Sequence, residues 1–261
     1  MKRVFITGAS SGIGAALAAH YAGAGAVVGL LARRHDALLA LLATLPHSPN
    51  SHLHRTYAVD VRDHAALYAA ATDFLAHAGG IDIVIANAGI SHGTLTERPE
   101  DLPVFADIVA TNVTATVATF APFIAALRTQ RTAGRLVGIG SVAGIRGLPG
   151  AGAYSASKAA VMTYCESLRV ELRPQGIHVV TIAPGYIDTP MTRHNPYRMP
   201  FLLAPEVFAA RAARAIDAGV SYRVIPWQMG IVAKLLRLLP DALYDLAFAR
   251  APRKPRKSSP S

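Results

Sequence analysis

Short apolar runs alternate with longer helical stretches along most of the chain. The first run, Arg3–Thr7, is followed by a helical pattern over residues 12–24 and by a second apolar run over residues 26–31. This order predicts a strand, a helix and another strand. Further strands are predicted, separated by segments long enough for a helix, at residues 53–59, 81–86, 135–140, 177–183 and Tyr222–Ile225.

The alternation indicates a parallel sheet with helices on both faces, because parallel neighbours need a crossover connection. We therefore predict an α/β fold with a single doubly wound parallel sheet of about seven strands. The 261 residues, with a mass of 27.5 kDa, fit one large domain better than two small ones. That domain covers residues 1–225 and precedes a helical extension over residues 226–249 and a basic tail over residues 250–261.

The helical extension combines an apolar composition with a regular polar spacing. Its polar stripe steps by four, three and four residues: Gly230, Lys234, Arg237 and Asp241. The spacing predicts an amphipathic helix that Pro240 breaks in two. Three roles are open for the apolar side: docking on the protein's own surface, attachment to a membrane interface, or contact between subunits.

The 26 lysine and arginine residues exceed the 16 acidic residues and give a net charge of +10. Half of that excess lies in the tail, at Arg250, Arg253, Lys254, Arg256 and Lys257. No recognition motif or interleaving of aromatic and basic residues accompanies it, so we expect no nucleic-acid partner. A flexible basic tail beside an amphipathic helix instead favours weak peripheral contact with an anionic membrane.

Composition places the chain among globular proteins. With 52% hydrophobic residues, 16% charged residues and a mean hydropathy of +0.31, its apolar surface can offset the entropy of ordering. Two uncharged stretches, residues 8–32 and 108–127, have the length of a membrane span. Six glycines interrupt the first, and Asn112, Pro122 and four threonines make the second too polar.

One cysteine, Cys165, excludes a disulfide framework and a cysteine-based zinc site. This usage is typical of a reducing compartment, so we expect a cytoplasmic protein, at most peripheral to the inner face of a membrane. His52 and His54 alternate on one face of a predicted strand, but no cysteine or carboxylate spacing completes a metal site around them. We therefore expect no metal.

Candidate chemistry begins directly after the first predicted strand, with the sequence TGASSGIG at residues 7–14. Its three glycines allow a tight turn and let the backbone approach a pyrophosphate, whose charge the amides at the start of the next helix can bind. Three glycines alone are equally compatible with an ordinary strand-to-helix turn. Their position after the first strand of an alternating pattern favours a dinucleotide site.

Two arginines, Arg33 and Arg34, follow the second predicted strand. Proteins that bind NAD usually place an acid here for the adenosine ribose, whereas an arginine can pair with a 2'-phosphate. The alternative is that both arginines are solvated residues at the start of a helix. Given the glycine-rich loop upstream, the pair favours NADP(H).

The sequence YSASK places Tyr154 and Lys158 four residues apart, so both side chains project from one face of a helix. A tyrosine has a pKa near 10, and a nearby ammonium favours the phenolate and brings that pKa closer to neutral pH. Ser141 ends the fifth predicted strand, thirteen residues earlier, and can hold a substrate oxygen that the phenol also touches. These three residues predict acid–base chemistry at a carbonyl or alcohol.

At this point the chain resembles the short-chain dehydrogenase/reductase family, over roughly residues 2–225. Seven family motifs occur in order: TGASSGIG, Asp60 in AVDV, ANAG at residues 86–89, Asn112 in TNV, Ser141, YSASK and PGYIDTP at residues 184–190. The resemblance implies a Rossmann fold and an oxidoreductase that uses a nicotinamide cofactor. One departure is Ala86, where many relatives have a second asparagine; this position mostly supports strand packing.

The resemblance also implies a role for each matching residue. Asn112, Ser141, Tyr154 and Lys158 form a catalytic tetrad. In it the tyrosine protonates the carbonyl oxygen, the serine orients it, the lysine binds the nicotinamide ribose, and the asparagine holds a water of the proton relay. Ile187 and Thr189 bind the nicotinamide carboxamide. The full set implied to bind the cofactor is Gly8, Ser10, Ser11, Gly12, Ile13, Gly14, Arg33, Arg34, Asp60, Val61, Asn87, Ala88, Gly89, Tyr154, Lys158, Pro184, Gly185, Ile187 and Thr189.

We therefore predict an NADP(H)-dependent oxidoreductase that interconverts a carbonyl and a secondary alcohol. The segment 190–206 is apolar, and this composition favours a bulky, lipid-like ketone as substrate. Its apolar residues include Met191, Met199, Phe201, Leu202 and Leu203. The same residues are equally compatible with a lid that only packs shut. The alternatives are an acyl-carrier thioester as substrate and a noncatalytic nucleotide-binding protein. The resemblance also implies pairing through the helices over residues 107–129 and 153–173, so we expect a homodimer.

Overall fold

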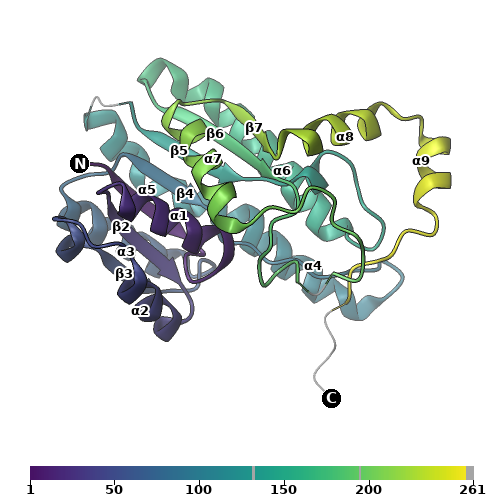
Figure 1. The fold of residues 1–261 in the computed structure, drawn as a ribbon, viewed down its shortest axis with the longest axis horizontal. Coiled ribbons are helices and arrows are strands. Elements are labelled where there is room, and N and C mark those ends of the chain that lie inside the picture. Colours follow the sequence, from purple (N-terminus) through teal and green to yellow (C-terminus); the bar gives the residue numbers. More distant parts are fainter. Residues whose placement is uncertain (131–132, 194, 257–261) are drawn as a thin grey trace.

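Seven parallel strands form the centre of the molecule, in the order β3-β2-β1-β4-β5-β6-β7 (Figure 1). The computed structural model describes residues 1–130, 133–193 and 195–256. The strands are β1 Arg3–Thr7, β2 Val27–Ala32, β3 Arg55–Ala58, β4 Ile83–Ala86, β5 Arg135–Ile139, β6 His178–Pro184 and β7 Tyr222–Ile225. The prediction of a doubly wound parallel sheet is confirmed.

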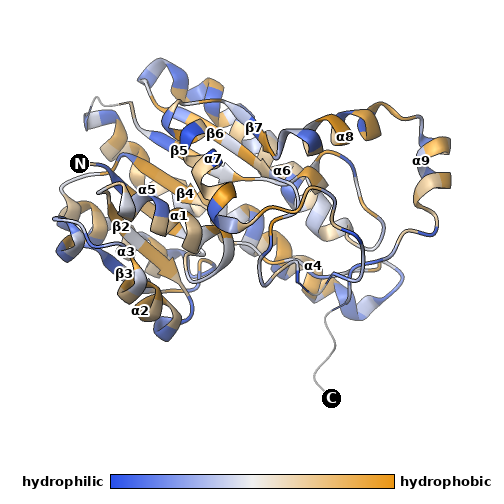
Figure 2. Ribbon diagram, viewed as in Figure 1, coloured by the Kyte–Doolittle hydropathy of each residue, from blue (hydrophilic) through white to orange (hydrophobic). Residues whose placement is uncertain are grey.

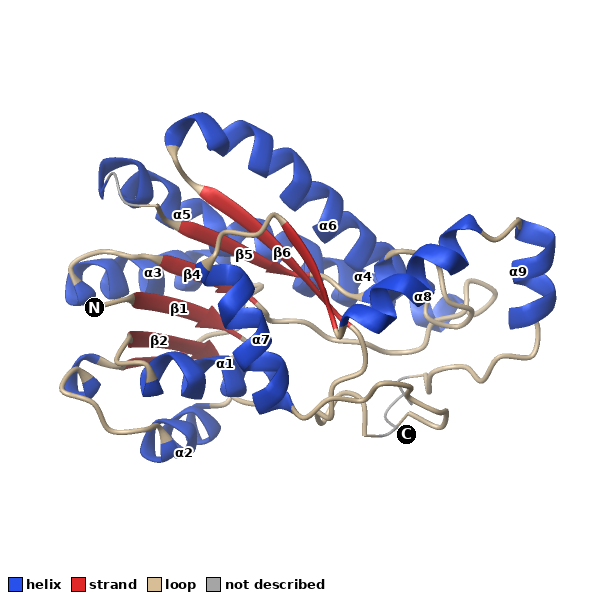
Figure 3. Ribbon diagram, turned by 45° about the horizontal axis from the view of Figure 1, so that its top comes forward, coloured by secondary structure: helices blue, strands red, loops and turns tan. Residues whose placement is uncertain are grey.

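Helices cover both faces of the sheet (Figure 3). One layer contains α1 (Gly12–Gly23), α2 (His35–Thr44) and α7 (Pro205–Asp217). The other contains α3 (His64–Ala78), α4 (Leu102–Val109), α5 (Ala115–Gln130) and α6 (Gly152–Leu172). Because both faces are covered, the strands are apolar on both sides, as β2 shows with all of its residues buried.

Aromatic side chains fill the core between the sheet and the second layer. The ring of Phe5 on β1 lies 5.0 Å from that of Phe123 on α5 and 5.6 Å from that of Phe74 on α3, measured between centroids. All three side chains are fully buried. The burial of these three rings fixes β1 against α3 and α5 and thereby holds the carboxyl end of β1 in place.

One helical segment, Pro99–Gln130, is long and apolar enough to cross a membrane, with a mean hydropathy of 1.6. A core helix of a soluble protein passes the same test. In this fold the segment packs against the sheet and α6, and it buries Ile108, Phe120 and Phe123 (Figure 2). Its apolar composition is explained by this packing.

The histidine pair does not share a strand face, so that prediction is wrong. Ser51–Leu53 form one turn of 3-10 helix, and β3 begins only at Arg55. The Ser51 hydroxyl, which accepts a hydrogen bond from the Ser48 amide at 2.8 Å, stabilises this turn in place of a strand. His54 is buried, and its Nδ1 accepts a hydrogen bond from the Val28 amide at 3.3 Å.

The extension forms two helices, α8 (Trp227–Leu238) and α9 (Asp241–Phe248), which project from the body of the molecule (Figure 1). The predicted break at Pro240 is therefore present. Arg146 anchors the junction: it donates hydrogen bonds to the carbonyls of Leu236 and Leu239, pairs with Asp241 at 2.9 Å, and lies 3.9 Å from the ring centroid of Tyr244.

The tail differs from the flexible segment that the charge run predicts. Residues 250–256 return from α9 to the body beside α4 (Figure 1). Arg256 pairs there with Asp101 at 2.8 Å and with Glu100 at 3.0 Å. Two carboxylates that lie far away in the sequence therefore hold this part of the tail. Lys257 lies outside the described residues.

Candidate active site

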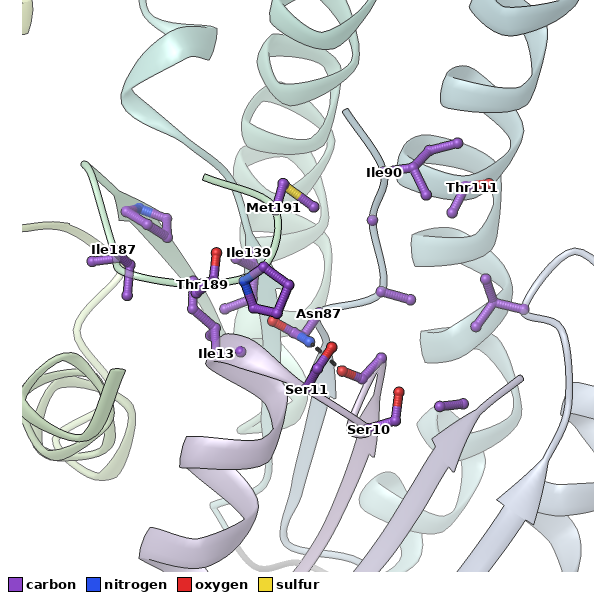
Figure 4. A pocket seen from close by; sticks show the side chains of 18 of the residues that line it. Ser10, Ser11, Ile13, Asn87, Ile90, Thr111, Ile139, Ile187, Thr189 and Met191 are labelled. Carbon is purple, nitrogen blue, oxygen red and sulfur yellow. Dashed lines mark hydrogen bonds between the residues drawn. The ribbon is translucent and has the colours of Figure 1, made fainter. Parts of the chain in front are cut away.

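A pocket opens at the carboxyl edge of the sheet, where β1 and β4 lie side by side (Figure 4). The chain leaves these neighbouring strands toward opposite faces, which creates a crevice at the edge. The predicted residues that line it are Gly8, Ser10, Ser11, Gly12, Ile13, Arg33, Arg34, Asp60, Val61, Asn87, Ala88, Gly89, Ser141, Tyr154, Lys158, Pro184, Gly185, Ile187 and Thr189. Prediction from the sequence missed other lining residues, among them Ile90, Thr111, Ile139, Gly140 and Thr192.

The glycine-rich loop connects β1 to α1 and forms one wall of the pocket. Gly8 has a φ of +66°, a conformation that favours glycine. A Cβ on Gly14 would lie 2.3 Å from the Gly8 carbonyl oxygen, so only glycine fits there. Gly14 does not itself appear in the pocket lining. Its role is to let α1 start close under the loop, with the helix N-terminus toward the pocket.

Asn87 and Thr7 connect the two strand ends that flank the crevice. The Asn87 side-chain amide donates to the carbonyls of Thr7 at 3.0 Å and Gly8 at 3.2 Å. The Thr7 hydroxyl oxygen in turn lies 3.2 Å from the amides of Asn87 and Ala88, from which it accepts. Thr7 is a positioning residue that the prediction did not assign, although it opens the TGASSGIG motif.

The two arginines after β2 lie at the opposite end of the pocket from Tyr154. Both are exposed, and Arg34 donates long hydrogen bonds to the hydroxyls of Ser10 at 3.3 Å and Ser11 at 3.4 Å. Asp60 lines the same end and pairs with Arg62 at 2.8 Å. Hydrogen bonding from Arg62 lowers the pKa of Asp60. This end therefore presents two cations, and no carboxylate within the described part of the chain forms an ion pair with either.

Ser141, Tyr154 and Lys158 meet at the inner end of the pocket. Ser141 follows β5, and its hydroxyl oxygen accepts from the Ala143 amide at 3.1 Å. Tyr154 and Lys158 lie one turn apart on α6, with the lysine Nζ 5.8 Å from the tyrosine ring centroid. The Lys158 ammonium donates to the Ile139 carbonyl at 2.8 Å.

Burial dominates the titration of this cluster. It raises the pKa of Tyr154, and hydrogen bonding from Ser141 opposes that rise. The net direction is upward because burial outweighs the hydrogen bond, so the lowering of the tyrosine pKa by the Lys158 ammonium stays a prediction. Burial also lowers the pKa of Lys158 to about 8.

Asn112 lies behind the pocket wall. It occupies a π-helical turn, Ala110–Thr114, between α4 and α5 and is 1% exposed. Its Oδ1 accepts from the Ile90 amide at 2.8 Å, and its Nδ2 donates to the Ile90 carbonyl at 3.0 Å and to the Ser157 hydroxyl at 2.9 Å. Both N–H groups are thus used within the protein, which makes the side chain a positioning group. The role of a water held by Asn112 stays a prediction.

The comparison with known families decides between an ordinary strand-to-helix turn and a dinucleotide site. The family model described as short chain dehydrogenase matches residues 2–198. The chain belongs to the short-chain dehydrogenase/reductase family. An oxidoreductase of this family binds a nicotinamide cofactor, and the glycine cradle at Gly8 and Gly14 fits the close approach of a pyrophosphate.

Similar proteins support this assignment over nearly the whole length. An uncharacterized oxidoreductase of Myxococcus xanthus is 35% identical over 254 residues, which cover 95% of this chain and 97% of that protein. A bovine protein named dehydrogenase/reductase SDR family member 7B is 32% identical, with 99% of this chain and 83% of that protein covered. The crystal structure of a short chain dehydrogenase from Mycobacterium paratuberculosis bound to NAD is 25% identical, with a TM-score of 0.75, and covers 85% of this chain and 95% of that one.

Replacement of Lys158, a buried lysine in the pocket of this short-chain dehydrogenase/reductase, tests how much its burial destabilises the fold. Lys158 has a pKa of about 8 in the folded protein, against an ordinary lysine value of 10.5, so the unfolded chain binds more protons between these values. The buried ammonium therefore destabilises the cofactor-free protein below pH 8, and the penalty falls as pH rises. We expect Lys158→Met to raise the free energy of unfolding at pH 7 by about 1–2 kcal/mol, after loss of its hydrogen bond.

Thermal unfolding at pH 7 and at pH 9.5 measures this effect. The increase in the unfolding midpoint that Lys158→Met produces should be smaller at pH 9.5, because the free-energy cost of burying the ammonium is smaller at that pH. Lys234→Met is the matched control, because that lysine is exposed on α8. A lower midpoint for Lys158→Met than for the control at pH 7 would show that the lysine stabilises the fold.

Proposed function

We propose that the protein is an NADP(H)-dependent oxidoreductase that interconverts a carbonyl and a secondary alcohol and works mainly as a carbonyl reductase. The observation that carries the proposal is the grouping of Ser141, Tyr154 and Lys158 in one pocket with the glycine-rich loop. A noncatalytic nucleotide-binding protein has no need of an acid, an orienting hydroxyl and a buried ammonium at that place. The alternative of a noncatalytic protein is therefore weaker.

The three side chains divide the proton chemistry among them. The bound cofactor supplies the hydride to the carbonyl carbon. Ser141 donates a hydrogen bond to the carbonyl oxygen and orients it, and Tyr154 transfers its phenolic proton to the same oxygen. The Lys158 ammonium stabilises the phenolate that remains until a proton from solvent replaces the one transferred. Alcohol oxidation reverses these steps.

The preference for NADP(H) rests on Arg33 and Arg34. Both line the pocket at the end of β2, where a carboxylate would repel a 2'-phosphate and an arginine pairs with it. A similar structure was solved with NAD bound, so the fold by itself does not decide for NADP(H), and the preference depends on the residues after β2. We propose Arg33 as the main phosphate partner and Arg34 as the second, since Arg34 also contacts the loop serines.

A bulky apolar ketone is the proposed substrate. Met191 lines the pocket, and Phe201 and Leu202 follow it along the segment between β6 and α7 with 49% and 44% of their surface exposed. Apolar side chains that remain exposed beside a catalytic pocket favour an apolar ligand. An acyl-carrier thioester is the alternative, because a basic protein surface suits an acidic carrier.

Assays with NADPH and a panel of ketones test the reaction directly. Tyr154→Phe removes the proposed acid but keeps the ring, so we expect activity to fall at least about a hundredfold while NADPH affinity stays within about twofold. Stopped-flow absorbance of NADPH measures the first quantity and fluorescence titration the second. Turnover that survives in Tyr154→Phe would refute the assigned acid.

Cofactor preference is tested with single arginine variants. A charge-assisted pair contributes about 1.5–3 kcal/mol, so Arg33→Ala should weaken NADPH binding about ten- to a hundredfold. NADH lacks the phosphate and should bind almost as before. Arg34→Ala provides the comparison and should give a smaller loss. Titration calorimetry that showed equal losses of NADPH and NADH affinity in Arg33→Ala would assign that arginine a structural role.

We further propose a cytoplasmic homodimer with weak, reversible attachment to anionic membranes. The buried single cysteine supports a reducing compartment, and residues 107–129 and 153–173 offer helices for pairing. Membrane contact is supported by the apolar side chains that α8 and α9 expose. Leu235, Leu238 and Leu246 are 62%, 79% and 79% exposed. Because Arg256 is paired within the fold, the charge available to a membrane is smaller than the tail sequence indicates.

Cosedimentation with anionic vesicles tests the attachment. We expect binding at low salt that weakens as salt rises, because each basic residue near the surface contributes about 1 kcal/mol. The pair Leu235→Glu and Leu238→Glu should abolish binding. Val170→Glu is the matched control, since this residue is similarly exposed, at 62%, but belongs to α6 and not to the extension. Equal binding by both variants would leave α8 and α9 without a membrane role.

A further inference from the structure

The C-terminal segment 250–256, called the strap below, lies against the chain that follows β4 on the substrate side of the active site. The Gly93 amide donates to the Pro255 carbonyl at 2.9 Å, and Gly93 and Arg256 form a parallel bridge. A Cβ on Gly93 would lie 2.2 Å from the Lys254 carbonyl oxygen. The strap therefore occupies a slot that only a glycine leaves open.

Charge pairing fixes the end of the strap. Arg256 donates to both carboxylate oxygens of Asp101, at 2.8 and 2.9 Å, and to Glu100 at 3.0 Å. The Asp101 side chain is buried, and it also accepts from the Leu95 amide at 2.9 Å. Hydrogen bonding from Arg256 lowers the pKa of Asp101. A bidentate pair of this kind fixes orientation as well as position.

The anchored strap places Lys254 beside Tyr154 of the active site. The lysine Nζ lies 2.8 Å from the Ser91 hydroxyl and 5.7 Å from the ring centroid of Tyr154. The side chain is half-buried, and burial lowers its pKa to about 8, so the ammonium is still charged at neutral pH. No carboxylate pairs with it in residues 1–130, 133–193 and 195–256.

Burying half of an ammonium group costs free energy, and no ion pair within the described part of the fold offsets this cost. The place of this ammonium beside the proposed acid means that an anion bound to it would lie only a few carbon atoms from a carbonyl held by Tyr154. A single ammonium and one hydroxyl match the single charge of a carboxylate. A phosphate, with nearly two charges and three acceptor oxygens, normally recruits more donors.

We propose that Lys254 binds a carboxylate of the substrate, and that the enzyme acts on oxo acids and the corresponding hydroxy acids. This inference rests on the proposed function and narrows its substrate. It agrees with the apolar residues Met191, Phe201 and Leu202, which can contact the hydrocarbon part of such an acid. Lys254 sets specificity, because it attracts acids over neutral carbonyl compounds of the same shape.

Matched pairs of substrates test the inference by kinetics. Benzoylformate, benzoylpropionate and levulinate are each assayed against their methyl esters with saturating NADPH, and dihydroxyacetone phosphate serves as the phosphate probe. We expect at least one acid to exceed its ester in kcat/KM about tenfold or more, mainly through KM. Lys254→Met should remove this ratio and leave ester turnover nearly unchanged, whereas Lys254→Arg should keep most of it. The exposed Lys234→Met is the control.

Four kinetic outcomes would overturn the inference. A ratio that persists in Lys254→Met would exclude the lysine as the carboxylate site. A pH profile displaced equally for acids and esters in Lys254→Met would show that it acts through Tyr154 instead. A clear preference for dihydroxyacetone phosphate would replace the carboxylate with a phosphate. Turnover of esters alone would leave the proposed oxidoreductase intact while the acid preference fails.

Binding measurements keep the test independent of turnover. Calorimetric titration of the NADP⁺ complex with phenylacetate and with methyl phenylacetate compares a carboxylate with its neutral analogue. Tighter binding of the acid by about tenfold, lost in Lys254→Met and retained in Lys234→Met, supports the site. Equal affinity for the two ligands, or the same preference in both variants, would contradict it.

Discussion

The meeting of β1 and β4 at the carboxyl edge of a parallel sheet is the constraint on which the active site depends. Parallel strands end at one edge, and the chain leaves these two toward opposite faces. The glycine-rich loop follows β1, Asn87 follows β4, Ser141 follows β5, and the segment to Thr189 follows β6. Topology therefore assembles the pocket from strand ends, and packing such as that of Phe5 against α3 and α5 holds those ends in register.

The same enclosure determines the electrostatics of the site. Removing water raises the pKa of Tyr154 and lowers that of Lys158, so each group resists the charge that its chemistry uses. We expect an anionic ligand bound close to these groups to change both pKa values. Ligand binding is thereby coupled to how easily Tyr154 gives up its proton.

Local sequence patterns predicted the sheet, the glycine-rich loop and the pairing of Tyr154 with Lys158, because strand periodicity, glycine spacing and a four-residue step are all local features. Most other pocket residues, among them Asp60, Asn87 and Thr189, came from the resemblance to the family. Local patterns also located the break at Pro240. The contacts that depend on distant partners were not predictable in this way. The bond from Asn112 to Ser157 joins residues 45 positions apart, and Arg256 reaches Asp101 across 155 positions. The strand predicted over residues 53–59 begins only at Arg55, because Ser51–Leu53 form a 3-10 turn that a hydrogen bond to the Ser51 hydroxyl stabilises.

A crystal structure of the complex with NADPH tests the central claim most directly. The account predicts the pyrophosphate against the glycine-rich loop, the 2'-phosphate within hydrogen-bond reach of Arg33 or Arg34, and the nicotinamide ring beside Tyr154 and Thr189. Together these contacts would place the reactive ring of the bound cofactor next to the proposed acid, Tyr154. A dinucleotide bound with its 2'-phosphate turned away from both arginines, or with its nicotinamide out of reach of the Tyr154 hydroxyl, would contradict the account.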